Sequence, residues 1–286
     1  HRPDVAVGAD IGATLAKLAI RGGDGITRFR LIPTRAIEQI ATEIDSASPG
    51  CIGLTGGGAA LVASQLAHGS NRADEFAAWR HGAIEILRRE KHDSSEPFLL
   101  VSLGTGTSAM LIRGDEVIRV GGTALGGGSL FGLGAALTGS TSFDQVIELA
   151  SGGDRRNVDL LVSDIYPTGE LPLPGDLNAA SFAKLGNPDL TDRASPADLA
   201  HAVVGMVGEN IGLICGGLAA SENVKRIVYG GSTLRNNSAM VDILHVMAAG
   251  RGQEAVFLKT PEYAGALGAL SLALGTAHPK PLRTPS

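Results

Sequence analysis

The sequence predicts an α/β protein of two lobes that share one core pattern. Residues 5–20, VAVGADIGATLAKLAI, form an apolar run, a glycine-containing turn and a second apolar run, which is typical of strand, tight turn and strand. Residues 98–120 repeat this pattern, with LGTGTS as the turn and a third apolar run after a short polar turn. The repeat indicates two similar lobes, each of which presents a glycine turn to a shared cleft.

In the first half of the chain, a strand meander is followed by helices. Strands are predicted before and after the turn at Asp10, and at the segments 26–32 and 51–54. Pro33 and Thr34 mark a helix start, because isoleucines then recur at helical spacing. Two more helices are predicted, one after the glycine turn 55–59 to about residue 68 and one over 74–91. The second is acidic at its start and basic at its end, which suits the helix dipole. Polar residues 92–97 are predicted to be a hinge.

The second half opens with predicted strands and continues with helices. Glycines crowd residues 121–134, so a close ligand approach or tight packing must explain them. Residues 168–186 are rich in proline and glycine and predict an extended excursion. Ser195 and Pro196 mark the start of a long apolar helix to about residue 219. The predicted strands are 98–102, 109–112, 117–120, 226–229 and 255–258; the predicted helices are 130–137, 142–151, 158–165, 238–249 and 262–274; residues 279–286 are predicted to be a frayed tail.

Composition narrows the class of protein. The 286 residues are 44% hydrophobic and only 4% aromatic, and their net charge is −5. Few aromatic residues and no basic excess argue against a nucleic-acid binder. Cys51 and Cys215 lie in apolar runs and are predicted to be buried thiols rather than a disulfide or a metal site. We expect no membrane span and no secretory leader, and therefore a cytoplasmic enzyme.

The turn at residues 10–14 has the residue types of a phosphate site. Gly12 lets the backbone approach a ligand, because no Cβ stands in the way. Successive amides in such a turn can point at phosphate oxygens. Asp10 adds a carboxylate for a hydrated Mg²⁺, and Thr14 adds a hydroxyl. The alternative is an ordinary hairpin turn, since a short glycine motif alone is weak evidence.

Several glycine turns in one chain carry more weight than one. The turns at residues 10–14, 104–108 and 230–233 resemble, in this order, the two phosphate turns and the adenosine turn of the actin, sugar-kinase and chaperone-ATPase superfamily. The segments LGTGTS, RVGGTALGGG, DIYP, LPLPGDLNAASF, GENIG, IVYGGSTLRNN and EYAGALGAL resemble type II pantothenate kinases, especially the short bacterial form. This resemblance extends from about residue 5 to residue 270, and residues 103–134 are its most specific part.

The resemblance implies a fold and a division into lobes. The fold would be two ribonuclease-H-like lobes, the duplicated arrangement of actin-like ATPases, around a nucleotide cleft. Residues 1–94 would form the N-terminal lobe, with the first phosphate turn and the catalytic helix. Residues 95–286 would form the C-terminal lobe, with the second phosphate turn, the adenosine turn and the pantothenate-binding strand.

The resemblance also implies ATP- and Mg²⁺-dependent phosphorylation of pantothenate, the first step of coenzyme A synthesis, by a homodimer. Glu75 would be the general base, and Ser108 and Arg119 would hold pantothenate. Lys17 would act in catalysis, and Asp10 would hold Mg²⁺, directly or through water. The residues implied to bind ATP or its phosphates are Asp10, Gly12, Ala13, Thr14, Lys17, Thr105, Gly127, Gly128, Ser129, Phe143 and Ser232.

Each role has a plainer structural alternative. Glu75 suits the first turn of a helix for electrostatic reasons alone. Arg119 could be a solvated charge on an edge strand, and Lys17 could extend along such a strand into water. Ser108 could be an ordinary turn residue and Phe143 a core residue. Trp79, the single tryptophan, is expected to pack or to anchor an interface.

Some positions depart from the family pattern. Ala13 stands where a second glycine is common, and a methyl group is tolerated there only if φ is negative. Residues 129–131 are Ser-Leu-Phe where animal members have Thr-Phe-Leu, and Ala264 replaces an aromatic residue. Both changes put feedback inhibition by acyl-coenzyme A, typical of animal members, in doubt.

Two other functions remain open from the sequence. One is phosphorylation of another small molecule such as a sugar, although two isolated cysteines cannot supply the zinc motif of repressor-type sugar kinases. The other is a nucleotide-binding regulator without catalysis, against which Lys17, Glu75 and Arg119 speak together. Arg119 distinguishes pantothenate from a sugar as the acceptor, because a guanidinium prefers an anionic acceptor.

Overall fold

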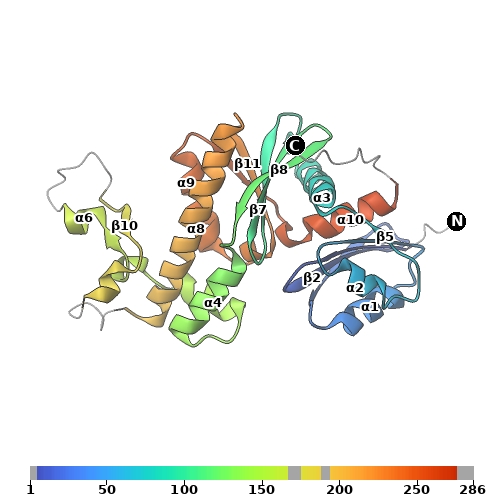
Figure 1. The fold of residues 1–286 in the computed structure, drawn as a ribbon, viewed down its shortest axis with the longest axis horizontal. Coiled ribbons are helices and arrows are strands. Elements are labelled where there is room, and N and C mark those ends of the chain that lie inside the picture. Colours follow the sequence, from blue (N-terminus) through green and yellow to red (C-terminus); the bar gives the residue numbers. More distant parts are fainter. Residues whose placement is uncertain (1–4, 167–174, 188–193, 276–286) are drawn as a thin grey trace.

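A computed structural model describes residues 5–166, 175–187 and 194–275. Its framework is two five-stranded mixed sheets with the same topology (Figure 1). In each sheet, three antiparallel strands form a meander, and two further strands add in parallel beside the first strand of that meander. The α/β class and the predicted repeat are confirmed. The repeat also extends to all five strands, beyond the three that the sequence indicated.

The first sheet has the strand order β3-β2-β1-β4-β5. β1 and β2 pair so that Asp10 lies opposite Lys17, on either side of the first turn. The bounds are β1 Ala6–Ile11, β2 Leu15–Arg21, β3 Thr27–Pro33, β4 Cys51–Thr55 and β5 Asn71–Arg72. β5 was not predicted, because two exposed polar residues carry no strand pattern.

The second sheet has the order β12-β11-β6-β7-β8. β6 and β7 flank the second turn, and a bulge interrupts the pairing of β7 with β8 between Ala109 and Met110. The bounds are β6 Phe98–Leu103, β7 Thr107–Arg113, β8 Glu116–Thr123, β11 Arg226–Gly230 and β12 Glu254–Phe257.

Helices fill three layers around these sheets. α1 (Ile37–Ser46) and α2 (Ala59–Ala63) cover the outer face of the first sheet with a small aliphatic core. α2 is shorter than the predicted helix, because the chain turns after Ala63. α3 (Glu75–Arg89) and α10 (Ala264–Ala273) lie between the two sheets and bury side chains of both. Figure 1 shows this central layer.

α3 and α10 approach each other closely. A Cβ at Gly82 would overlap the carbonyl oxygen of Ala264, and one at Gly268 would overlap that of Ala78. α10 also packs on β1 and β4, where Gly8 and Gly53 leave room for its backbone. The C-terminal helix therefore contacts the first sheet. The boundary between residues 94 and 95 separates the two sheets but does not account for α10, so it stays a prediction.

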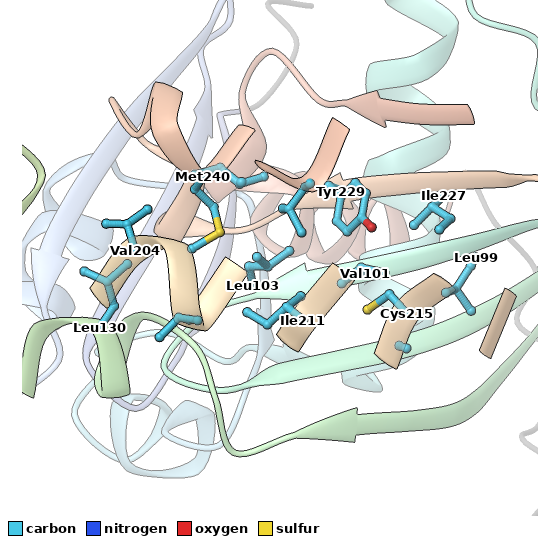
Figure 2. Close-up of a cluster of buried hydrophobic side chains, with 14 of the residues drawn as sticks. Leu99, Val101, Leu103, Leu130, Val204, Ile211, Cys215, Ile227, Tyr229 and Met240 are labelled. Carbon is cyan, nitrogen blue, oxygen red and sulfur yellow. The ribbon is translucent and has the colours of Figure 1, made fainter. Parts of the chain in front are cut away.

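The outer face of the second sheet carries the largest core. Four helices cover it: α4 Gly127–Thr138, α5 Phe143–Ser151, α8 Pro196–Ser221 and α9 Ser238–Ala249. Figure 2 shows Val204, Ile211 and Cys215 of α8 against the sheet residues Leu103 and Tyr229. Burial raises the pKa of Cys215 to about 12, so this thiol stays neutral. Cys51, in contrast, is only half-buried, and its thiol donates to the carbonyl oxygen of Ala273.

Most predicted helices of the second lobe are confirmed. α5, α8 and α9 have their predicted starts, and Ser142 and Ser195 cap α5 and α8. α4 begins three residues before the predicted position. α8 is long and apolar enough to span a membrane, but it is mostly buried and is a core helix.

The segment after α5 projects from α8 (Figure 1). The helix predicted over 158–165 is wrong in its first half, because β9 pairs there with β10. Arg155 pairs with Asp159 of the same segment and with Glu209 of α8, and the second ion pair holds the segment to α8. The bounds are η1 Arg155–Asn157, β9 Leu160–Leu161, α6 Val162–Ile165, β10 Asn178–Ala180 and η2 Ala183–Gly186. The prediction for 168–186 lies partly, and that for 279–286 entirely, outside the described residues.

Candidate active site

A cavity of about 510 Å³ lies where the glycine turns of the two sheets face each other. Its lining comes from both sheets and from α3, which lies between them. The lining residues are Asp10, Gly12, Ala13, Thr14, Leu15, Lys17, Glu75, Trp79, Ser102, Gly104, Thr105, Gly106, Thr107, Ser108, Arg119, Gly122, Thr123, Ala124, Gly231 and Ser232. The shared cleft predicted from the repeat is therefore present.

The first turn holds two buried charges. Asp10 is 3% exposed and Lys17 is 8% exposed, and the Lys17 Nζ lies 3.7 Å from Asp10 Oδ2. A Cβ on Gly12 would lie 2.9 Å from Lys17 Nζ, so the missing side chain leaves space for the ammonium group. Ala13 is not among the described residues with positive φ, and its methyl group therefore fits the turn without strain.

Asp10 is packed between two glycines. A Cβ on Gly56 would lie 2.8 Å from Asp10 Oδ1, and one on Gly265 would lie 2.6 Å from Asp10 Oδ2. Burial raises the pKa of Asp10, and the nearby Lys17 ammonium opposes this rise. The carboxylate is thus held in a site that leaves it short of compensating partners, which suits a group that meets a cation.

The second turn has no charge and is shaped by backbone hydrogen bonds. The carbonyl oxygen of Gly104 accepts from the amide of Gly127 at 2.8 Å and from Thr233 Oγ1 at 2.9 Å. The amide of Gly128 donates to the carbonyl oxygen of Thr105 at 2.9 Å. These bonds join the second turn to the start of α4 and to the turn η3 (Ser232–Leu234).

One hydrogen bond joins the two turns directly. Thr14 Oγ1 and Thr105 Oγ1 are 3.0 Å apart, although the residues are 91 positions apart in the sequence. Both side chains are exposed to the cavity. The two hydroxyl groups therefore link the two glycine turns at the cavity.

Glu75 stands at the first turn of α3, which Asp74 caps by accepting from the amide of Ala77 at 2.9 Å. The carboxyl group is open to the cavity, yet desolvation by the surrounding walls raises its pKa, and the charge of Asp10 adds to the rise while Lys17 opposes it. A carboxyl group with a raised pKa in a cleft is suited to proton transfer.

The opposite end of the cavity carries Ser108 on β7 and Arg119 on β8. The bulge between β7 and β8 places Gly122 opposite Ser108. A Cβ on Gly122 would lie 2.9 Å from Arg119 Nη2, so this glycine makes room for the guanidinium. Among the described residues, no carboxylate pairs with Arg119, which leaves its charge free to meet an anion.

Arg80 ties α3 to the strands that bear the cationic end. Its Nε donates to the carbonyl oxygen of Gly114 at 2.9 Å, and its Nη2 donates to Asp115 Oδ1 at 2.8 Å. Gly114 and Asp115 form the turn between β7 and β8. The helix with Glu75 and the strand with Arg119 are thus held in a fixed relation.

The cavity brings together most of the predicted site residues. The exceptions are Gly127, Gly128, Ser129 and Phe143, which do not line it. The amides of Gly127 and Gly128 are used to shape the second turn, and Ser129 Oγ donates to the carbonyl oxygen of Ala124. Phe143 begins α5 and packs against the core of the second sheet. The roles predicted for these four residues stay predictions.

Sequence reasoning missed several lining residues. Trp79 was predicted to pack, and it does so, but it also faces the cavity. Its spacing of four from Glu75 on one helix was the available signal. Ser102 gave no signal, because only the strand pairing brings it to the cleft. Gly122 belongs to the glycine-rich segment 121–134, for which a close ligand approach was one explanation. Among the described residues, no group of three His, Cys, Asp or Glu side chains could hold a metal ion.

Comparison with known proteins gives a consistent result. A model of the Fumble family matches residues 28–272. A type II pantothenate kinase of Staphylococcus epidermidis is 34% identical over 266 residues, which cover 93% of this chain and 99% of that protein. The type II pantothenate kinase of Staphylococcus aureus (strain USA300) is 32% identical, with 93% and 98% covered.

Solved structures share the fold at low sequence identity. The activator of 2-hydroxyisocaproyl-CoA dehydratase from Clostridium difficile, with bound ADPNP, matches with a TM-score of 0.63 at 16% identity, and 95% of each chain is covered. A ROK family glucokinase from Streptomyces griseus, in complex with glucose and AMPPNP, matches with a TM-score of 0.60 at 12% identity over 95% of this chain and 99% of that one. The predicted actin-like ATPase fold is confirmed.

Proposed function

The chain belongs to the Fumble family, and from this premise we propose that it is a type II pantothenate kinase, which transfers the γ-phosphate of ATP to the 4′-hydroxyl of pantothenate in the first step of coenzyme A synthesis. The observation that carries the proposal is the match to type II pantothenate kinases over 93% of the chain. The cavity supports it, because one cleft contains the carboxyl group of Glu75, a glycine turn with two buried charges and Arg119, which has no carboxylate partner among the described residues.

In this proposal Glu75 is the general base. Its carboxylate accepts the proton of the acceptor hydroxyl as the oxygen attacks the γ-phosphorus. The bond from that phosphorus to the bridging oxygen breaks, and ADP leaves with the electron pair. A base must be within hydrogen-bond reach of the hydroxyl, and the start of α3 offers Glu75 directly to the cleft.

Lys17 and Asp10 act at the phosphate end. Phosphoryl transfer depends mainly on positioning and charge neutralisation, and the Lys17 ammonium would neutralise oxygens of the transferred group. Asp10 would hold Mg²⁺ directly or through water, in agreement with its burial beside few partners. When bound, Mg²⁺ neutralises phosphate charge. Gly12, Ala13, Thr14 and Thr105 would contact the phosphates.

Arg119 and Ser108 would hold the acceptor. Pantothenate carries a carboxylate, which a guanidinium pairs with bidentately. Arg119 has no carboxylate partner among the described residues and lines the cavity, so it is available for this contact. The proposal assigns the rest of the nucleotide site to Gly127, Gly128, Ser129, Phe143 and Ser232. Of these, Ser232 lines the cavity, and the rest lie on adjoining elements.

The function is tested by an ATP-consumption assay with pantothenate, pantetheine and a panel of sugars. We expect pantothenate to be phosphorylated and sugars to be left unchanged. Glu75→Gln should retain ATP binding and reduce turnover by on the order of a hundredfold or more, because the amide cannot accept the proton. Near-normal turnover in this variant would exclude Glu75 as the base. Glu85→Gln, a partly buried carboxylate of α3 that does not line the cavity, is the matched control.

Arg119→Ala tests the acceptor site. Loss of a charged hydrogen bond of about 1.5–3 kcal/mol should raise the apparent KM for pantothenate by one to two orders of magnitude. The KM for ATP should be unchanged. Arg113→Ala, at the other end of the same hairpin and paired with Glu222, is the control. An unchanged KM for pantothenate would remove Arg119 from the site.

We also propose that the enzyme is a cytoplasmic homodimer. The second lobe offers exposed apolar side chains, with Leu213 of α8 at 47% and Val246 of α9 at 66% exposure. Light scattering on Leu213→Glu and Val246→Glu would test whether these positions are in the subunit interface. A dimer of unchanged stability would show that they are not.

A further inference from the structure

Trp79 is the residue at the cavity that the proposed function leaves without a role. It is the single tryptophan of the sequence, it is 4% exposed, and it lines the cavity. It lies four residues after Glu75 on α3, so the two side chains project from the same face of the helix. An aromatic surface is therefore present one helical turn from the base.

The rest of the cavity is polar near this point. The lining side chains other than Trp79 are mainly carboxylates, ammonium and guanidinium groups and hydroxyls, and the other apolar ones are alanines and Leu15. Leu15 begins β2, directly after the phosphate turn. Trp79 is thus the one aromatic residue of the lining, one helical turn from Glu75.

A row of small residues connects Trp79 with Arg119. Gly230, Ser102, Ser108 and Gly122 are paired in register across four adjacent strands of the second sheet. At one end, a Cβ on Gly230 would lie 3.1 Å from Trp79 Cζ3; at the other, one on Gly122 would lie 2.9 Å from Arg119 Nη2. Ser102, Ser108 and Gly122 line the cavity and form a narrow floor. Gly230, which does not line it, continues the row to Trp79, and Arg119 lies at the other end.

The dimensions of this row suit an extended acceptor. Three strand spacings of about 4.8 Å give a length of roughly 14 Å. A pantoyl group joined to β-alanine is about as long as three residues and extends over roughly 11 Å. With its carboxylate at Arg119, such a molecule would bring its hydroxyl end and the adjacent dimethyl carbon to the end of the row that Glu75 and Trp79 occupy.

We propose that Trp79 determines acceptor specificity by packing against the two methyl groups beside the reacting hydroxyl. The inference rests on the proposed function. The acceptor class it defines is a primary alcohol with a branched apolar carbon next to the hydroxymethyl group and an anion at the far end. A linear acceptor would lack the contact between the two methyl groups and the indole, which costs binding energy.

The single tryptophan provides a direct test that needs no variant. Titration of the wild-type protein with pantothenate should shift or quench its tryptophan emission with saturation at one site. The analogue with hydrogens in place of both methyl groups should produce a smaller change at saturation. Unchanged emission at saturating pantothenate would overturn the inference.

Kinetics of variants supply the second test. Trp79→Leu should raise the KM for pantothenate about tenfold, as expected for two methyl groups that lose their packing surface, and should leave the KM for the analogue without methyl groups nearly unchanged. Trp79→Phe should show a smaller effect of the same kind. An equal loss with both acceptors, beside an active wild-type enzyme, overturns this inference and leaves the proposed function intact.

Controls separate packing in the core from contact with the acceptor. Ile86→Ala removes a side chain of the same helix and core that does not line the cavity. It should lower the melting temperature without changing the ratio of the two KM values. If the wild-type enzyme phosphorylates neither acceptor, the proposed function itself fails, and the inference about Trp79 fails with it.

Discussion

The two glycine turns occupy equivalent positions in two sheets of the same topology, yet they differ in chemistry. The turn between β1 and β2 carries a buried carboxylate and a buried ammonium group, Asp10 and Lys17. The turn between β6 and β7 carries hydroxyls and glycines, and its shape is fixed by hydrogen bonds to α4 and η3. The first turn thus contributes charged side chains to the cavity, and the second contributes an uncharged turn held in shape by hydrogen bonds.

The difference follows from what each turn is packed against. Gly56 and Gly265 leave a close-fitting space for the Asp10 carboxylate in the first lobe. In the second lobe, the carbonyl oxygen of Gly104 is occupied by Gly127 and Thr233. We infer that substitutions at the first turn mainly reduce turnover, whereas those at the second mainly weaken nucleotide binding.

The largest effect is expected for Asp10→Asn. Loss of the carboxylate that would hold Mg²⁺ should reduce turnover about a thousandfold, since metal coordination contributes several kcal/mol to stabilising the transition state. Turnover measured against Mg²⁺ concentration checks this. Asp24→Asn, an exposed carboxylate of the same lobe, should have wild-type activity. Wild-type turnover in Asp10→Asn would contradict the inference that the charges of the first turn contribute to turnover.

Lys17→Met should reduce turnover about a hundredfold, because one positioned cation is lost from the phosphate site. It should also change the pH profile. The raised pKa of Glu75 means that activity is lost as pH falls through that pKa, because a protonated carboxyl group cannot act as the base. Lys17 lowers this pKa, so its removal should move the acid limb to higher pH.

The pH profile is measured as kcat/KM for pantothenate between roughly pH 5 and pH 8. Arg21→Met, at the far end of β2, provides the control for loss of a cation from the same strand. An acid limb at the same pH in Lys17→Met and in the wild type would show that Glu75 and Lys17 do not interact as described.

Gly127→Ala should raise the KM for ATP about tenfold with little change in turnover. A Cβ there would lie 2.6 Å from Thr233 Oγ1 and 3.1 Å from the carbonyl oxygen of Gly104, so the second turn must shift, at a cost of about 1–3 kcal/mol. Gly132→Ala in the same helix meets no atom within 4 Å and is the matched control. Equal KM values for the two variants would contradict the role given to the second turn.

The smallest effect is expected where the turns meet. Thr14→Ala and Thr105→Ala should each lower the free energy of unfolding by about 1 kcal/mol, as for one hydrogen bond. The double variant should cost less than the sum, because both remove the same bond. Thr42→Ala in α1 removes a hydroxyl that donates to the carbonyl oxygen of Glu38. Its effect on the free energy of unfolding should add to that of Thr105→Ala without coupling. Additivity of Thr14→Ala and Thr105→Ala would show that the lobes are not joined there.

Local chemistry explains which elements were predictable. α3 begins where Asp74 was expected to start a helix, and α8 begins after the Ser195 cap. The strands at the two glycine turns follow the expected alternation of apolar runs and glycine turns. Each of these signals acts within a few residues, so it is readable without knowledge of the fold.

Other features depend on distant segments and were not predictable. The glycines of residues 121–134 indicated close packing, but the sequence did not show that the amides of Gly127 and Gly128 bond to Gly104 and Thr105. The pairing of β9 with β10 replaced part of a predicted helix, because a partner strand about 20 residues later satisfies its backbone groups. The return of α10 to the first sheet likewise depends on glycines far from it in sequence.

The sequence by itself determined the strands beside the two glycine turns, the caps of α5 and α8, the family and the residue types at the first turn, because these signals lie in short segments. Tertiary structure alone decided that Lys17 is buried beside Asp10, that Trp79 faces the cleft and that Thr14 meets Thr105. These contacts join residues of different elements or lobes. They exist only once packing of the two sheets around α3 and α10 fixes the distances between them.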